Sequence, residues 1–329
     1  MKWKFYSLAF VAGMSILTAC SSDDNNDNDG NGGNGNGNEI ENGTILKGTI
    51  TSDVTLAAGN TYKLSGEYIV EEGATLHIEE GVKIIAVYDD IADYILVKQG
   101  GKINAVGTPD KPIVMTSEKE EPGAWGGIHI CGRAHTNAEG GKGSSEIGGA
   151  VYGGNDDADN SGTLQYIRLE YTGFAFDEEH EANGISFYGV GNGTIVDHCQ
   201  AYKGSDDGFE FFGGSVNVSN LVAVSCSDDS FDWTEGWNGK GTNLVAYQEA
   251  ESTLGYDCDC LMECDNNGSN NAATPVAHPV LKNLILVGNG GSKQGIRLRA
   301  GTEVEIDNAK VCGKGQPLTV ETALTENAL

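Results

Sequence analysis

The sequence predicts an all-β fold in which a single chain winds into a solenoid of stacked coils. Residues 205–211 (SDDGFEF) and 227–233 (SDDSFDW) are copies of each other, offset by 22 residues, the length of one coil. A column of polar residues recurs in the same register, and each is followed by an apolar pair at spacing two, as in a strand with one buried face. The members of this column are Tyr166, His198, Asn220, Asn243, Asn283 and Asn308.

A second strand column supports the same fold. In it, a small residue precedes two apolar side chains at spacing two, which we expect to point inward. The steps along the polar column vary from 22 to 40 residues, which indicates constant coils joined by loops of different length. Insertions at 174–183 and 249–278 flank the acidic coils, and insertions on one side of a solenoid commonly build its binding face. The segments of the second column are 127–130, 184–187, 208–211, 230–233 and 295–298.

Residues 1–19 have the pattern of a secretory signal peptide. Lys2 and Lys4 precede an apolar run at 8–17, which is too short to span a bilayer. The run ends in Leu-Thr-Ala-Cys, which resembles the lipobox of bacterial lipoproteins and implies that Cys20 is lipidated. Residues 21–24 (SSDD) resemble the acidic signal that sends lipoproteins of some Gram-negative bacteria to the cell exterior. These resemblances imply an outer-membrane lipoprotein that faces outward, and an ordinary cleaved signal is the alternative.

Residues 20–39 are expected to be a lipidated, disordered tether. Positions 25–38 are almost entirely Asn, Gly and Asp, a composition that buries no apolar area. One folded domain is expected over 40–329. The 48 acidic and 20 basic residues give a formal net charge of −28, which argues against nucleic acid as a partner. We expect the membrane to be contacted only through the lipid anchor.

The ends of the solenoid are less regular than its middle. Residues 49–117 alternate apolar and polar side chains with weaker repeats, as expected of entry coils. Residues 125–128 (WGGI) open the regular part. The segment after Lys314 is poorer in pattern, and we expect it to cover the C-terminal end of the stack.

Between residues 49 and 313 the chain resembles bacterial surface proteins with a right-handed parallel β-helix, the fold of pectate lyases. The resemblance rests on the phrases at 103–108 (INAVGT), 125–128 (WGGI), 205–209 (SDDGF) and 295–299 (GIRLR). It implies a single-stranded right-handed parallel β-helix. These phrases specify architecture, and a shared fold does not decide function.

The outward residues of the second column form a predicted carboxylate row. This row holds Glu210, Asp232 and, if 262–264 is the next strand, Glu263; a shift by one residue would expose Met262 instead. Like charges one coil apart, about 4.8 Å, resist joint ionisation unless they bind a hard cation. Calcium is the expected ion, and the alternative is that the aspartate pairs only shape the turn. The row begins at His129 and Ser186, ends at Arg297, and is preceded in the turns by Asp206, Asp207, Asp228 and Asp229.

The phrase at 206–210 also resembles the calcium-binding Asp-Asp-Gly phrase of family 9 polysaccharide lyases, which are right-handed β-helices. That resemblance implies Asp206, Asp207 and Glu210 as calcium ligands. The last acidic position is a glutamate here, and no lysine aligns with the catalytic lysine of the family. Lysines that are candidates by proximity alone are Lys203, Lys240 and Lys293.

Seven cysteines besides Cys20 are available for pairing in an oxidising exterior. Cys199 lies on an inward column and is expected to be a core residue. The close spacing of Cys258, Cys260 and Cys264, without clustered histidines, favours a disulfide that pins a loop over a zinc site.

Three functions fit these features. The first is a calcium-containing surface protein that binds polysaccharide or another surface glycan, with Trp237 in a loop and with Lys240 and Arg297 as further contacts. The second is a polysaccharide lyase or a glycosidase that uses two carboxylates. The third is a structural or adhesive rod. The sequence ranks binding first.

Overall fold

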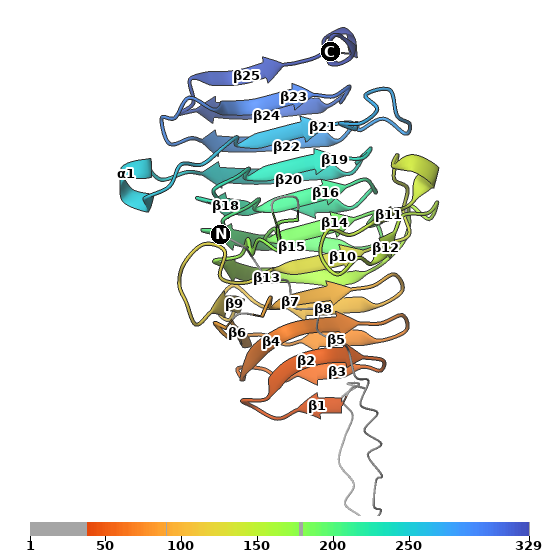
Figure 1. The fold of residues 1–329 in the computed structure, drawn as a ribbon, viewed down its shortest axis with the longest axis vertical. Helices are drawn as coiled ribbons and strands as arrows, with labels where there is room; N and C mark the ends of the chain where they lie inside the picture. The colour runs from red at the N-terminus through yellow and green to blue at the C-terminus, as the bar shows by residue number, and fades with distance from the viewer. Residues whose placement is uncertain (1–37, 90, 178–179, 329) are drawn as a thin grey trace, which may run out of the picture. The chain divides into compact units, whose positions relative to one another are not determined.

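The computed structural model describes residues 38–89, 91–177 and 180–328. The predicted signal peptide, Cys20 and nearly all of the predicted tether lie outside these residues. The described strands stack from β1 at one end to β25 at the other and pair as one 23-stranded sheet (Figure 1). Its pairings are parallel, and a separate two-stranded antiparallel sheet is formed by β11 (Gly143–Ser144) and β12 (Val151–Tyr152). The chain is a right-handed parallel β-helix, as predicted.

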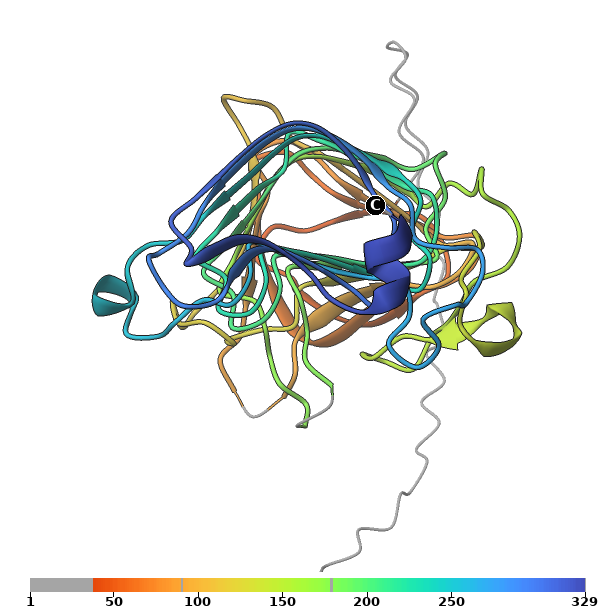
Figure 2. The same cartoon turned by 90° about the horizontal axis from the view of Figure 1, so that it is seen from above.

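The sheet folds into three faces, here called A, B and C, which surround the core (Figure 2). Face A contains β7 (Tyr94–Val97), β10 (Ile128–Cys131), β14 (Ile185–Tyr188), β16 (Phe209–Phe212), β19 (Phe231–Thr234), β21 (Met262–Asp265), β23 (Gln294–Arg299) and β25 (Gln316–Val320). Face B contains β1 (Asn38–Ile40), β3 (Val54–Leu56), β5 (Thr75–Ile78), β8 (Lys102–Val106) and β17 (Asn217–Ser219), and face C contains β6 (Lys83–Ala86), β9 (Ile113–Ser117) and β18 (Val222–Val224).

Longer strands bend from one face to the next. Two of them, β2 (Ile45–Ile50) and β4 (Thr61–Val70), run from face C to face A. The strands that run from face B to face C are β13 (Gly162–Glu170), β15 (Ile195–Tyr202), β20 (Lys240–Tyr247), β22 (Val280–Val287) and β24 (Glu305–Cys312).

The polar column predicted from the sequence forms the bend between faces B and C. Its residues, from Tyr166 to Asn308, have φ between 52° and 62°, the left-handed region that asparagine tolerates better than most residues. The amide Nδ2 of Asn243 donates to Asn220 Oδ1 at 2.8 Å, and Asn283 Nδ2 donates to Asn243 Oδ1 at 3.0 Å. Asn308 continues the ladder to Asn283 at 2.8 Å. At this bend, the asparagine side chains of successive coils therefore hydrogen-bond to one another.

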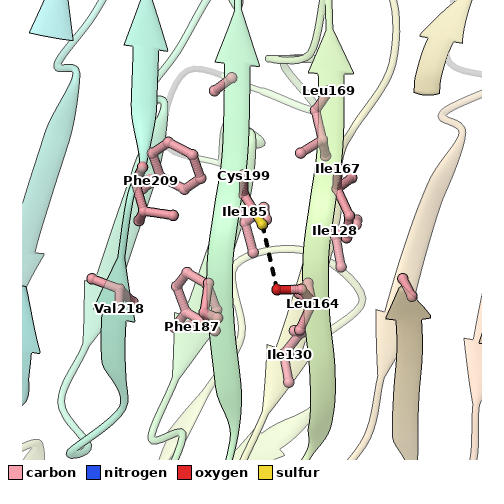
Figure 3. Close-up of a cluster of buried hydrophobic side chains, with 14 of the residues drawn as sticks. Ile128, Ile130, Leu164, Ile167, Leu169, Ile185, Phe187, Cys199, Phe209 and Val218 are labelled. Carbon is pink, nitrogen blue, oxygen red and sulfur yellow. Dashed lines mark hydrogen bonds between the residues drawn. The ribbon is translucent and has the colours of Figure 1, made fainter. Parts of the chain in front are cut away.

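The core inside the coils consists of stacked apolar side chains that come from all three faces (Figure 3). Phe187 and Phe211 stack at 5.1 Å between ring centroids, and Phe211 stacks on Trp237 at 4.2 Å. Cys199 points into this core, as predicted, and its thiol donates to the Leu164 carbonyl at 3.6 Å.

A second apolar cluster covers the outer surface of face A at β7, β10 and β14. The long excursion between β10 and β13, which contains β11, β12 and a short 3-10 turn (Glu139–Gly141), folds back over these strands. His129 points outward from its strand, yet it is fully buried between Tyr94 and Tyr188. The outward position predicted for His129 is confirmed, but the side chain is not exposed to solvent because the excursion covers it.

Two short helices complete the described chain. Helix α1 (Glu251–Leu254) belongs to the insertion after β20, and α2 (Ala323–Ala328) follows β25 at the C-terminal end of the stack (Figures 1 and 2). Neither these helices nor any other helix among the described residues has the length and apolar character needed to cross a membrane.

The asparagine ladder makes a stability prediction. In Asn243→Ala, two side-chain hydrogen bonds are lost and an alanine is forced to a φ of 57°. In Asn243→Gly the same bonds are lost without the backbone strain. We expect the alanine variant to be less stable by about 2 kcal/mol and the glycine variant by about half of that. Urea unfolding of both variants measures the difference, and equal midpoints would contradict the strain argument.

Candidate metal centre

The carboxylate row lies on the outer side of face A in the predicted register. Ser186 pairs with Glu210, Glu210 with Asp232, Asp232 with Glu263, and Glu263 with Arg297. The assignment of Glu263 rather than Met262 to the outward position is confirmed, because Met262 is buried in the core. Parallel stacking therefore brings three carboxylates from adjacent coils together.

The second aspartate of each repeated turn ties one coil to the next. Asp207 Oδ1 accepts the backbone N–H of Asp229 at 2.8 Å, and Asp229 Oδ1 accepts the N–H of Cys260 at 2.6 Å. Asn183 Oδ1 accepts the N–H of Asp207 at 3.1 Å, so it takes the same role one coil earlier. The turn chemistry weighed against metal binding is thus present at Asp207 and Asp229.

The first aspartate of each turn forms a column of its own. Asp206 is 8% exposed, whereas Asp228 lies exposed at the rim. The equivalent residue of the following coil, Asp259, forms an ion pair with Lys293 at 2.5 Å. Asp206 and Asp228 form no ion pair with a lysine or arginine within the described part of the chain.

These columns enclose a small polar pocket of about 200 Å³. Three of the residues that line this pocket were not predicted from the sequence. Glu146 comes from the excursion between β10 and β13, while Glu181 and Asn183 come from the insertion before β14. Asn183 Nδ2 donates to Glu210 at 2.5 Å. The lining residues are Glu146, Glu181, Asn183, Asp206, Asp207, Glu210, Asp228 and Asp232.

The protein's own cations neutralise only one end of the carboxylate row. Arg297 contacts Glu263 at 2.8 Å and Glu321 at 3.0 Å, and Arg299 pairs with Glu263 and with Asp265. Among the described residues, no lysine or arginine forms an ion pair with a carboxylate that lines the pocket. The pocket therefore gathers carboxyl groups that are not paired with a lysine or arginine of the described chain.

Burial and mutual repulsion keep protons on these carboxyl groups. Desolvation, together with the charge of Asp228 and of nearby glutamates, raises the pKa of Asp206 to about 8. Desolvation also raises the pKa of Asp207, Glu210 and Asp232 well above the usual range, with neighbouring carboxylates adding to the shift. The pKa of Glu146 is raised to about 7 for the same reasons. Without a cation, this site is ionised only at an energetic cost.

The oxygen atoms are close enough together to share ions. Donor atoms within each of three carboxylate triads lie within 4.8 Å of one another. An all-oxygen, all-anionic donor set fits a hard divalent cation such as Ca²⁺. The side chains present therefore fit the predicted metal. The triads are Asp206, Asp207 and Asp228; Asp207, Glu210 and Asp232; and Asp229, Asp232 and Glu263.

The three residues predicted to contact a glycan do not converge on the pocket. Trp237 is 1% exposed, and its indole N–H donates to the Val216 carbonyl, so it is a core residue and not a platform for a sugar. Lys240 lies on face B, beside a separate polar groove of about 510 Å³. Arg297 is held by two glutamates. The prediction for Trp237 fails because the turn after β19 folds inward onto Phe211.

The cysteine prediction is also corrected. The described cysteines, among them Cys258, Cys260 and Cys264, are free thiols. Cys264 points into the core from β21, and Cys260 occupies the position that Asp229 holds one coil earlier. A mixed cluster of Asp229, Asp259 and Cys260 lies beside the pocket, without a histidine.

One family model matches the chain, and it describes a pectate-lyase-like beta helix domain over residues 48–329. No curated protein matches the chain. The match covers the stack from β2 onward, including the three faces and the acidic turns. The chain therefore belongs to the family of pectate-lyase-like beta helix domains.

Proposed function

We propose that this protein is a cell-surface-anchored lipoprotein whose β-helix binds calcium and, with it, a polysaccharide. The observation that carries the proposal is the pocket of about 200 Å³ whose carboxylates form no ion pair with a lysine or arginine among the described residues. A divalent cation removes both the repulsion between these groups and the cost of burying their charge.

Stacking explains why calcium suits the pocket better than the protein's own side chains. Asp207 belongs to two of the triads, so two ions would share one carboxylate and span two coils. The residues that would hold calcium are Asp206, Asp207, Glu210, Asp228 and Asp232, and Asp229 with Glu263 would complete the third triad beside Arg299. Bound calcium offers open coordination positions to hydroxyl or carboxylate oxygens of a glycan.

Binding is favoured over lyase chemistry because none of the three candidate lysines, all of them described residues, combines a place at the pocket with a lowered pKa. A general base works best with a pKa near the operating pH. The ion pair with Asp259 raises the pKa of Lys293. Burial alone would lower the pKa of Lys203, but its contacts with Glu249 and Tyr202 outweigh burial and raise it. Lys240 lies on another face.

The anchor is proposed from the sequence. Lipidation of Cys20, followed by the acidic residues 21–24 and the polar tether, would hold the β-helix at the outer surface of the outer membrane, within reach of external glycans.

Calcium binding is tested by calorimetry on the mature chain. We expect saturable binding with a dissociation constant on the order of 10⁻⁴ M or tighter, and loss of that binding in the double variant Asp206→Ala/Asp228→Ala. The matched control is Asp110→Ala/Glu139→Ala, which removes two exposed acidic residues that have no ion pair. Calcium binding that survives in the pocket variant, or that is lost equally in the control, would contradict the proposed calcium site.

The same proteins are then tested on a panel of polygalacturonate, alginate and dextran, with calcium and with chelator. The proposal expects a polymer to be retained with calcium and released by chelator, with no new unsaturated or reducing ends. Turnover would instead assign an enzyme. Calcium binding without retention of any polymer would leave calcium as a stabiliser of a surface rod.

Stability without calcium should depend on pH in a defined direction. An unfolded aspartate titrates near 4, whereas folding raises the pKa of Asp206 to about 8. Between these values the folded state binds more protons than the unfolded state, so stability falls as pH rises. In chelator we expect a lower melting temperature at pH 8 than at pH 5, and calcium should restore it. The Asp206→Ala/Asp228→Ala variant should show a smaller difference, and an unchanged difference would contradict this origin.

Lipidation is tested in a Gram-negative host by incorporation of labelled palmitate into the full-length chain. We expect labelling that is abolished in Cys20→Ala, and sensitivity of the intact cells' protein to external protease. Palmitate incorporation that persists in Cys20→Ala would refute the anchor.

A further inference from the structure

A further cavity, of about 630 Å³, lies at the corner between faces C and A, nearer the N-terminal end of the stack than the acidic pocket. Its floor is formed where β2 and β4 bend, at Gly48 and Gly66, which have φ of 75° and 78°. Neither residue has a side chain to fill the corner. Ile91, Ala92 and the ring of Tyr94 line the cavity beside them.

The loop before β7 is fixed against this corner. Asp93 is 1% exposed, and its Oδ1 accepts the backbone N–H of Gly66 at 2.5 Å. Ile91, two residues earlier, is nevertheless 57% exposed, and its N–H donates to Asp89 Oδ1 at 2.8 Å. A large aliphatic side chain is thus exposed to solvent two residues before Asp93, which is hydrogen-bonded to the corner.

A hairpin connects this corner to the acidic pocket. An antiparallel bridge between Ala175 and Glu181 closes the hairpin, and the backbone N–H of Phe176 donates to the His180 carbonyl at 2.9 Å. The ring of Phe176 packs edge-to-face against Tyr94 at 5.9 Å and remains 39% exposed. Glu181, on the other arm, lines the acidic pocket. In Figure 2 this hairpin and the loop before β7 project from the same side of the coil.

We propose that the exposed side chains of Ile91 and Phe176, together with the ring of Tyr94, which is 6% exposed and supports them, form a second subsite, here called the apolar shelf, for the polysaccharide that the calcium pocket holds. This inference rests on the proposed function. The continuity of the shelf with the pocket through one hairpin selects the glycan as its occupant. Aromatic and aliphatic surface packs against the C–H faces of sugar rings, and a few polar groups at the rim fix their orientation. Lys47, Ser65 and Glu67 supply such groups here.

The separation of the two subsites defines the class of ligand. Tyr94 lies on β7, and the pairing passes through β10 and β14 before it reaches β16, which carries Glu210. Three coil steps correspond to about 14 Å. A ligand that contacts both subsites is therefore an oligosaccharide or polymer, and a disaccharide reaches only one of them. The shelf also gives the glycan an uncharged contact on a strongly acidic protein.

The test compares Phe176→Ala/Ile91→Ala with the matched control Tyr247→Ala/Ile285→Ala, which removes two side chains of similar exposure, 47% and 48%, from face C. The probes are the polymer retained in the panel above and its disaccharide, both with calcium. We expect the shelf variant to bind the polymer about tenfold more weakly, with unchanged affinity for the disaccharide and for calcium. Phe176→Trp should restore polymer binding, and the control should match the wild type.

Failure of the shelf can be distinguished from failure of glycan binding itself. If the wild type retains no polymer, glycan binding itself fails and the shelf with it. If the wild type retains polymer and the shelf variant binds it equally well, the shelf alone is refuted. A loss that is equal for polymer and disaccharide would also overturn the proposal, because it would place both ligands at one site. Melting curves of both variants confirm that these exposed positions leave the fold intact.

Discussion

The constraint on which this structure depends is that each residue of a coil lies one strand spacing from its equivalent in the next coil. Whatever side chain the sequence repeats is stacked upon itself. For asparagine the result is a ladder of amide hydrogen bonds from Asn220 to Asn308, and for phenylalanine it is the stack of Phe187 on Phe211. For acidic residues the same geometry is unfavourable, because Glu210, Asp232 and Glu263 are brought together by their register.

The chain resolves this repulsion differently at the two ends of the row. At β23 the columns end in basic side chains, with Lys293 against Asp259, Arg297 against Glu263, and Arg299 against Asp265. At β16 and β19 no lysine or arginine among the described residues forms an ion pair with the row, and two excursions add Glu146 and Glu181. A protein that only needed a stable stack would have no reason to gather further acids there. The asymmetry is therefore the strongest argument for an external cation.

The sequence predicted those features that follow from period and register. The outward position of Glu263, the inward position of Cys199 and the repeating column from Tyr166 to Asn308 all follow from counting along the coil. It did not predict what covers the outside of the coil. His129 is outward yet buried, and Glu146 reaches the pocket from a non-repeating excursion. The prediction that Trp237 contacts a sugar was wrong for a similar reason, since a turn residue can fold inward without changing the strand pattern.

The repeated aspartate pairs reconcile the two interpretations that the sequence left open. Asp207 and Asp229 each use one carboxylate oxygen to accept a backbone N–H from the next coil, so they define the turn. Asp206 and Asp228 make no such contact between coils, and their column faces the pocket. One oxygen of Asp207 remains for the pocket while the other holds the coil. In the proposed calcium site, turn chemistry and metal binding use different atoms of the same motif. Substitution of the first aspartate of each pair therefore tests metal binding while the backbone contacts of Asp207 and Asp229 remain.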